Sequence, residues 1–107
     1  MARDIADVLE QAAQLLSQPG AWTQGAFQRG EKCFCLLGAI AFVTGDNPHC
    51  AWGNTLASDA REPLADAIGI PTFAVVDWND APERTQDEVV AKLREAATLA
   101  RAAQVRA

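Results

Sequence analysis

The chain has 107 residues, of which half are hydrophobic and 21% are charged, and its formal net charge is −5. This length and balance predict one folded domain spanning residues 1–107 rather than a disordered chain. Lys and Arg form no cluster, which argues against binding to nucleic acid through its phosphates. No apolar run approaches 18 residues, so we expect no transmembrane span and no membrane partner.

The first residues, MARDIADVLE, carry acids where a secretory signal peptide has an apolar block. Three cysteines are an odd number for a disulfide framework, and such frameworks belong to exported proteins. Both observations predict a cytoplasmic protein.

The first predicted element is a helix that begins after Asp4, a favourable N-cap residue, and ends at the SQPG segment, residues 17–20. Apolar residues recur there at steps of three and four, which is the spacing of one buried helix face. This predicted stripe contains Ile5, Val8, Leu9, Ala12, Leu15 and Leu16.

Residues 21–32, AWTQGAFQRGEK, are rich in turn formers and predict a connection in which Trp22 and Phe27 act as apolar anchors. The most apolar stretch follows at residues 33–45, CFCLLGAIAFVTG. Its length and its mostly unbranched residues favour a buried helix that Gly45 ends, although short apolar runs are also compatible with a strand.

Residues 46–54 predict a loop from their Asp, Asn, Pro and Gly content. A short helix is expected over residues 63–68, with Asp59 and Glu62 arranged like a capping box before it. Residues 73–77 are compatible with a short extended segment or a short helix. We favour the helix, because a lone strand would leave its backbone groups unpaired.

The last predicted element is a long helix after Thr85, which forms a T-x-x-E capping box with Glu88. The whole pattern predicts an all-α fold, a compact bundle of about four to five helices with long first and last helices. The buried stripe of this last helix is expected to contain Val89, Val90, Leu93, Ala96, Ala97 and Ala100.

A set of three cysteines and one histidine is the first candidate site, because these residue types form tetrahedral zinc sites. The set contains Cys33, Cys35, His49 and Cys50. Its spacing matches none of the common zinc patterns, and small buried cysteines are the alternative interpretation.

A cysteine nucleophile is the second candidate. Cys35 lies near a predicted helix start, where the helix dipole lowers a thiol pKa, and His49 is the only histidine that could act as its base. This pair would indicate a hydrolase or a transferase. A cysteine in so apolar a stretch is more often part of the core.

The WND segment, Trp78 to Asp80, is the third candidate. Asp77 and Asp80 flank an aromatic residue, an arrangement that can hold a divalent cation or a sugar. The alternative is that Asn79 or Asp80 caps a turn while Trp78 fills the core. We expect at least two of the three tryptophans (Trp22, Trp52 and Trp78) to be core residues.

Three motifs occur in a fixed order, W-x-Q-G, CLLGA and WND…T-x-x-E-V. Together they resemble a small domain family of unknown function from bacterial and phage proteins, over about residues 5–100. The resemblance implies no activity. Among the cysteines it includes only Cys35, which weakens the zinc hypothesis. The motif residues are Trp22, Gly25, Cys35, Gly38, Trp78, Asn79, Asp80 and Thr85.

No complete catalytic constellation is present, so the sequence favours a non-catalytic accessory module without a cofactor. Its expected partner is a protein or a small molecule. The tryptophan rings would supply apolar contact, and the polar side chains beside them would supply hydrogen bonds. The expected binding corner contains Trp22, Gly25, Cys35, Trp78, Asn79 and Asp80.

Overall fold

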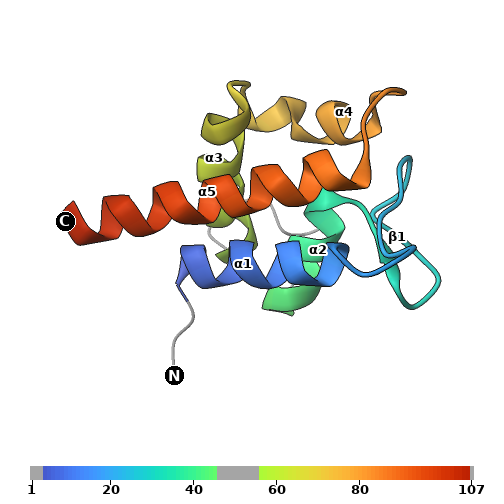
Figure 1. Cartoon of the computed structure of the whole chain (residues 1–107), viewed down its shortest axis with the longest axis horizontal. Coiled ribbons are helices and arrows are strands. Elements are labelled where there is room, and N and C mark those ends of the chain that lie inside the picture. The colour runs from blue at the N-terminus through green and yellow to red at the C-terminus, as the bar shows by residue number, and fades with distance from the viewer. Residues whose placement is uncertain (1–3, 46–55, 107) are drawn as a thin grey trace.

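Helices dominate the structure, a computed structural model that describes residues 4–45 and 56–106 (Figure 1). The mostly α fold predicted from the sequence is confirmed, with one small two-stranded sheet in addition. The elements are α1 (Ile5–Leu16), β1 (Gln28–Arg29), β2 (Cys33–Phe34), α2 (Leu36–Thr44), α3 (Leu56–Ile68), the 3₁₀ turn η1 (Thr72–Ala74), α4 (Val75–Asp80) and α5 (Gln86–Arg106).

Helices α1 and α5 lie side by side and antiparallel (Figure 1). The Oδ1 atom of Asp4 accepts a hydrogen bond from the amide of Asp7 at 2.7 Å, so Asp4 caps α1 as predicted. At the other end of α1, the Nε2 atom of Gln86 donates to the carbonyls of Leu16 (2.6 Å) and Gln18 (2.8 Å). The start of α5 therefore satisfies backbone carbonyls at the end of α1.

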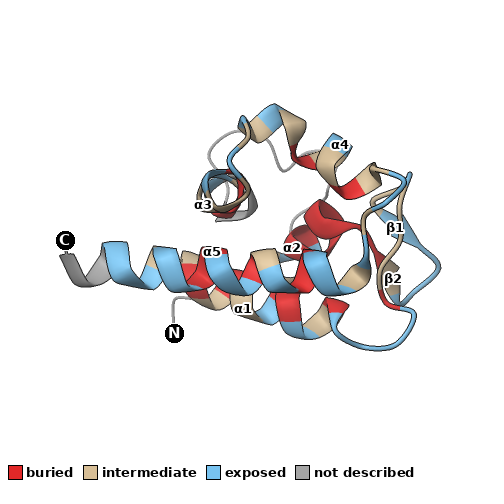
Figure 2. Cartoon of the chain, turned by 45° about the horizontal axis from the view of Figure 1, so that its top comes forward, coloured by how far each residue is buried: buried red, intermediate tan, exposed pale blue. Residues whose placement is uncertain are grey.

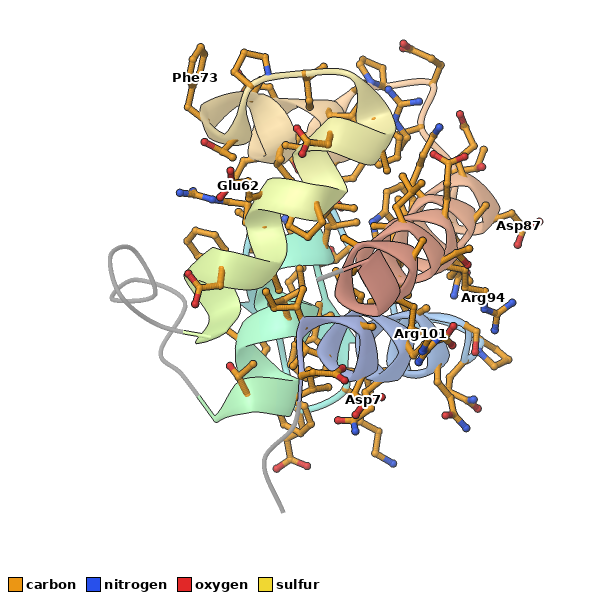
Figure 3. All side chains as sticks on the ribbon, turned by 90° about the vertical axis from the view of Figure 1, so that its left-hand side faces the viewer. Asp7, Glu62, Phe73, Asp87, Arg94 and Arg101 are labelled. Atoms are coloured by element: carbon orange, nitrogen blue, oxygen red, sulfur yellow. The ribbon has the colours of Figure 1, made fainter. Side chains whose placement is uncertain are left out.

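Ion pairs contribute little to this helix pair. Figure 3 shows Arg101 of α5 beside Asp7 of α1, with a separation of 3.5 Å between Nη2 and Oδ1. Both side chains are about half exposed, and exposed pairs of this kind are worth at most about 1 kcal/mol. The two helices are therefore held mainly by their apolar faces.

The apolar faces of the helices meet in one core. Figure 2 shows buried residues along α1, α2 and α5. The predicted stripes of the first and last helices both contribute to it. None of the helices in the described ranges is long and apolar enough to cross a membrane. The largest fully buried apolar side chains are Val8, Leu9, Leu16, Phe34, Leu36, Ile40, Leu64, Val75, Val89 and Leu93.

The predicted helix over residues 33–45 is wrong at its start, because α2 begins at Leu36. The preceding residues form β2, which pairs antiparallel with β1. The amide of Phe34 donates to the carbonyl of Ala21 at 2.7 Å, and its carbonyl accepts from the amide of Thr23 at 2.9 Å. These backbone bonds to the 21–29 connection keep residues 33 and 34 extended. Gly45 ends the helix with φ +81°, as expected.

The predicted short helix over residues 63–68 is also wrong in its extent, since α3 spans Leu56–Ile68. Pro63 lies in the interior of this helix instead of in its first turn. A proline removes one backbone hydrogen bond. The buried residues Ala60, Leu64 and Ala65 surround that position and pack into the core, so tertiary packing maintains the helix through the proline.

Residues 72–80 form η1 and α4, so the favoured helical interpretation of residues 73–77 is confirmed and the extended one is wrong.

The capping box of α5 is present as predicted. The amide of Thr85 donates to Oε1 of Glu88 at 3.1 Å, and the amide of Glu88 donates to Oγ1 of Thr85 at 3.2 Å.

A close backbone approach fixes the 21–34 segment on the start of α2. The carbonyl oxygen of Phe27 accepts a hydrogen bond from the amide of Cys35 at 3.1 Å. The same oxygen occupies the space next to Gly38, where a Cβ atom would collide with it. A residue with a side chain at position 38 would therefore displace this backbone.

Substitution of Gly38 by Ala tests this approach. The added Cβ must push away a backbone carbonyl, so we expect the free energy of unfolding to fall by about 3 kcal/mol or more. Gly45→Ala is the control, because its cost of about 1 kcal/mol arises from its positive φ alone, with open space around the added atom. Urea unfolding of both variants measures the difference. Equal losses would contradict the proposed collision.

Candidate functional site

The side chain of Asn79 joins three segments that are distant in the sequence. It is 1% exposed, the one polar residue among the described residues classed as buried. Its Oδ1 atom accepts from Nε1 of Trp22 at 2.8 Å and from the amide of Leu36 at 3.1 Å. Its Nδ2 group donates to the carbonyl of Thr23 at 3.2 Å and to Oδ1 of Asp80 at 3.0 Å. Asn79 therefore connects α4 to the 21–24 segment and to the start of α2.

Gln24 forms a second link between the same segments. Its Nε2 group donates to the carbonyls of Asn79 (2.9 Å) and Ala81 (2.8 Å). Next to it, the amide of Gly25 donates to Oδ1 of Asp80 at 3.0 Å. These bonds satisfy backbone carbonyls at the end of α4 and orient the Asp80 carboxylate.

The Trp78 ring contacts Arg84 and the core instead of taking part in these links. The guanidinium of Arg84 lies over its ring, with Cζ 3.9 Å from the ring centroid, and Nε of Arg84 donates to the Trp78 carbonyl at 2.9 Å. Half-buried Trp78 also packs against the core. Its ring is thus already covered by a cation–π contact and by apolar neighbours.

A pocket of about 490 Å³ opens beside these links. We call it the Asp80 pocket. Val76 and Asp80 line it from α4, and Cys35 lines it from the start of α2. The end of the connection before β1 and the first residue of β1 form the rest of its wall. Its lining residues are Gly25, Ala26, Phe27, Gln28, Cys35, Val76 and Asp80.

Of the six residues of the expected binding corner, three reach the pocket: Gly25, Cys35 and Asp80. Trp22 and Asn79 are bonded to each other and are not among the lining residues. The structure therefore brings five of the six together through short contacts or a shared pocket wall. Trp78 is the one that faces elsewhere.

The sequence did not single out Ala26, Gln28 or Val76 as site residues, and it treated Phe27 only as an anchor. Val76 lies one helical turn before Asp80 on α4, so a helical assignment of residues 75–80 could have placed both on one face. Nothing in the residue types of Ala26 or Gln28 signals a pocket. Their position follows from the backbone path between α1 and β1.

Cys35 is the N-cap residue of α2, and its Sγ atom accepts from the amide of Gly38 at 3.3 Å. Burial raises the pKa of this thiol, the Gly38 amide opposes that effect, and the charge of Asp80 raises the pKa further. The thiol is therefore protonated at neutral pH. A protonated thiol is a poor nucleophile, contrary to the lowered pKa expected at a helix start.

The remaining candidates fall partly outside the described ranges. His49, Cys50 and Trp52 lie there, so the zinc set and the Cys35–His49 pair are incomplete in the structure. Cys33, on β2, is half-buried, and no cluster of three or more His, Cys, Asp or Glu residues occurs within residues 4–45 and 56–106. Asp77 is exposed on α4 and does not line the pocket with Asp80.

The chain belongs to a family of unknown function (DUF6197), whose model it matches over residues 1–99. No curated protein and no solved structure matches the chain. The match covers the α4 segment, the Asn79 links and every residue of the Asp80 pocket.

The raised pKa of Cys35 predicts a loss of stability at alkaline pH. Because the folded pKa exceeds the unfolded one, the contribution of this thiol is complete below about pH 8.5 and decreases as the pH rises towards the folded pKa. Urea unfolding between about pH 7.5 and 10 should show wild type losing stability relative to Cys35→Ser, which retains an N-cap oxygen. A difference that stays constant with pH would contradict the prediction.

Proposed function

We propose that the chain is a non-catalytic binding module and that the Asp80 pocket receives a small molecule or one side chain of a protein partner. The observation that carries the proposal is the pocket itself. Its volume of about 490 Å³ lies within the range of about 300–1,000 Å³ that small-molecule sites occupy. Its lining combines apolar surface with few polar groups, as such sites do.

The walls of the pocket are held in place before any ligand arrives. Asn79 and Gln24 bind the connection before β1 to α4 through hydrogen bonds between 2.8 and 3.2 Å. The Phe27 backbone is held against α2 by the Cys35 amide. A preformed pocket reduces the entropy lost on binding, which favours recognition of a small group.

The chemical groups in the pocket support binding better than catalysis. Cys35 contributes a protonated thiol, and Asp80 contributes a carboxylate already engaged through one oxygen. A hydrolase or transferase using Cys35 would require a base that deprotonates this buried thiol. Among the described residues that line the pocket, the Asp80 carboxylate is the one candidate base, and its charge opposes formation of a thiolate.

Under this proposal, two residues of the expected binding corner support the pocket and three contact the ligand. Trp22 and Asn79 act as supports, because their polar groups bond to each other and to the backbone. Recognition is assigned to Gly25, Cys35 and Asp80, together with the apolar surface of Val76. A cytoplasmic location and a bacterial or phage origin stay predictions from the sequence.

Filling the pocket tests the proposal. Ala26 is half-buried in the wall, so Ala26→Leu should occupy part of the volume and weaken binding of any ligand there about tenfold. A fragment library is screened by two-dimensional NMR of the ¹⁵N-labelled chain. Hits on wild type should shift the amides of Gly25–Gln28 and Val76.

Ala91→Leu provides the matched control, because it adds the same side chain at an exposed position of α5. This control should bind each hit as wild type does. Hits that shift other surfaces, or that bind Ala26→Leu as tightly as Ala91→Leu, would contradict the assignment of the pocket.

A further inference from the structure

The Asp80 carboxylate is held rigidly and has one oxygen available. Its Oδ1 atom accepts from the Gly25 amide and from Nδ2 of Asn79, both at 3.0 Å. Its Oδ2 atom takes part in no hydrogen bond within the described ranges. Asp80 is half-buried and lines the pocket, so this second oxygen belongs to a group that is oriented but only partly satisfied.

No cation of the described part of the chain forms an ion pair with this carboxylate. The ion pairs there join Arg84 to Glu88, Lys92 to Glu95, and Arg101 to residues of α1. Arg29 lies on the strand beside the pocket wall, but its Nη2 group donates to the carbonyl of Gln24 at 3.3 Å. Asp80 thus has no ion-pair partner among the described residues, and its carboxylate can form an ion pair with a cationic ligand.

An anionic ligand is disfavoured at the same place, although a helix begins there. Three amides at the start of α2 already have acceptors. The Cys35 amide bonds to the Phe27 carbonyl, the Leu36 amide bonds to Asn79, and the Gly38 amide bonds to the Cys35 sulfur. An anion would therefore meet the Asp80 charge at a helix start where most of the N–H groups that bind anions already have acceptors.

We propose that the Asp80 pocket binds a small organic cation, an ammonium or guanidinium group attached to an apolar body. The cationic group would donate to Oδ2 of Asp80, and the apolar body would contact Val76 and Ala26. The inference rests on the proposed function and names the ligand class of that site. The same chemistry is supplied by a free amine or by a Lys or Arg side chain of a partner.

Three probes of similar size and different charge test the ligand class: 2-phenylethylamine, 2-phenylethanol and phenylacetate. Each is titrated into the ¹⁵N-labelled chain while the amides of Gly25, Ala26 and Val76 are followed. We expect the amine to bind at least about tenfold more tightly than the alcohol, because it adds a charge-assisted hydrogen bond. Phenylacetate should bind most weakly.

Asp80→Asn separates charge from shape. The amide oxygen still accepts from Gly25, so the pocket persists, while the affinity for the amine should fall about tenfold and that for the alcohol should stay unchanged. Asp77→Asn is the matched control, with the same loss of charge at an exposed position of the same helix. It should bind the amine as wild type does, and circular dichroism checks that both variants fold.

Failure of the inference and failure of the proposed function give different results. If 2-phenylethanol or phenylacetate shifts the pocket amides at a concentration equal to or below that of the amine, the pocket stands and the cation assignment is overturned. An equal loss of amine affinity in Asp77→Asn also overturns the cation assignment. If neither the probes nor a fragment library shifts those amides, both are overturned.

A last comparison separates the two sources of the cation. A blocked tripeptide, acetyl-Ala-Arg-Ala-amide, is titrated beside the amine. Tighter binding of the peptide supports a partner's side chain, and tighter binding of the amine supports a free small molecule. Both outcomes support a cation site, whereas equally tight binding of acetyl-Ala-Gln-Ala-amide would contradict it.

Discussion

The side-chain amide of Asn79 is the interaction on which the pocket end of the molecule depends. The 21–34 connection contains only two short strands and has little regular structure of its own. Its position is fixed by bonds to Asn79 from the Trp22 indole and by the bond from Nδ2 to the Thr23 carbonyl. Because the Leu36 amide bonds to the same Oδ1 atom, one buried side chain positions α2, α4 and the connection together. Loss of a partner would leave buried donors unpaired, at about 1–3 kcal/mol each.

This support gives the Asp80 pocket its chemistry. Asn79 and Gly25 both donate to one oxygen of the Asp80 carboxylate, and the other oxygen takes part in no hydrogen bond among the described residues. Gly38 permits the Phe27 carbonyl to approach the start of α2, and this carbonyl in turn occupies the Cys35 amide. Most amides at the helix start thereby have acceptors already, and Asp80 has no ion-pair partner among the described residues. The proposed preference for cations thus follows from which backbone groups are already satisfied.

Local sequence patterns correctly predicted the two long helices, because capping residues and apolar spacing lie within each helix or directly beside it. The T-x-x-E box located the start of α5, and the three- and four-residue steps located α1. The start of α2 could not be predicted, because residues 33 and 34 are kept extended by backbone bonds to residues 21 and 23. The motifs brought Trp22, Cys35 and Asp80 to attention, yet only the packed structure shows that Asn79 supports the pocket while Asp80 lines it. Trp78 belongs to the expected binding corner, yet its ring is covered by Arg84.

Hydrogen exchange of two N–H groups measured by NMR tests the central role of Asn79 most directly. The Leu36 amide and the Trp22 indole both donate to its Oδ1 atom. In wild type both should exchange slowly. In Asn79→Ala, protection at both should fall by about tenfold or more beyond any change at the buried Leu93 amide of α5, since each donor loses its acceptor. Unchanged protection of both groups relative to Leu93 would contradict the account.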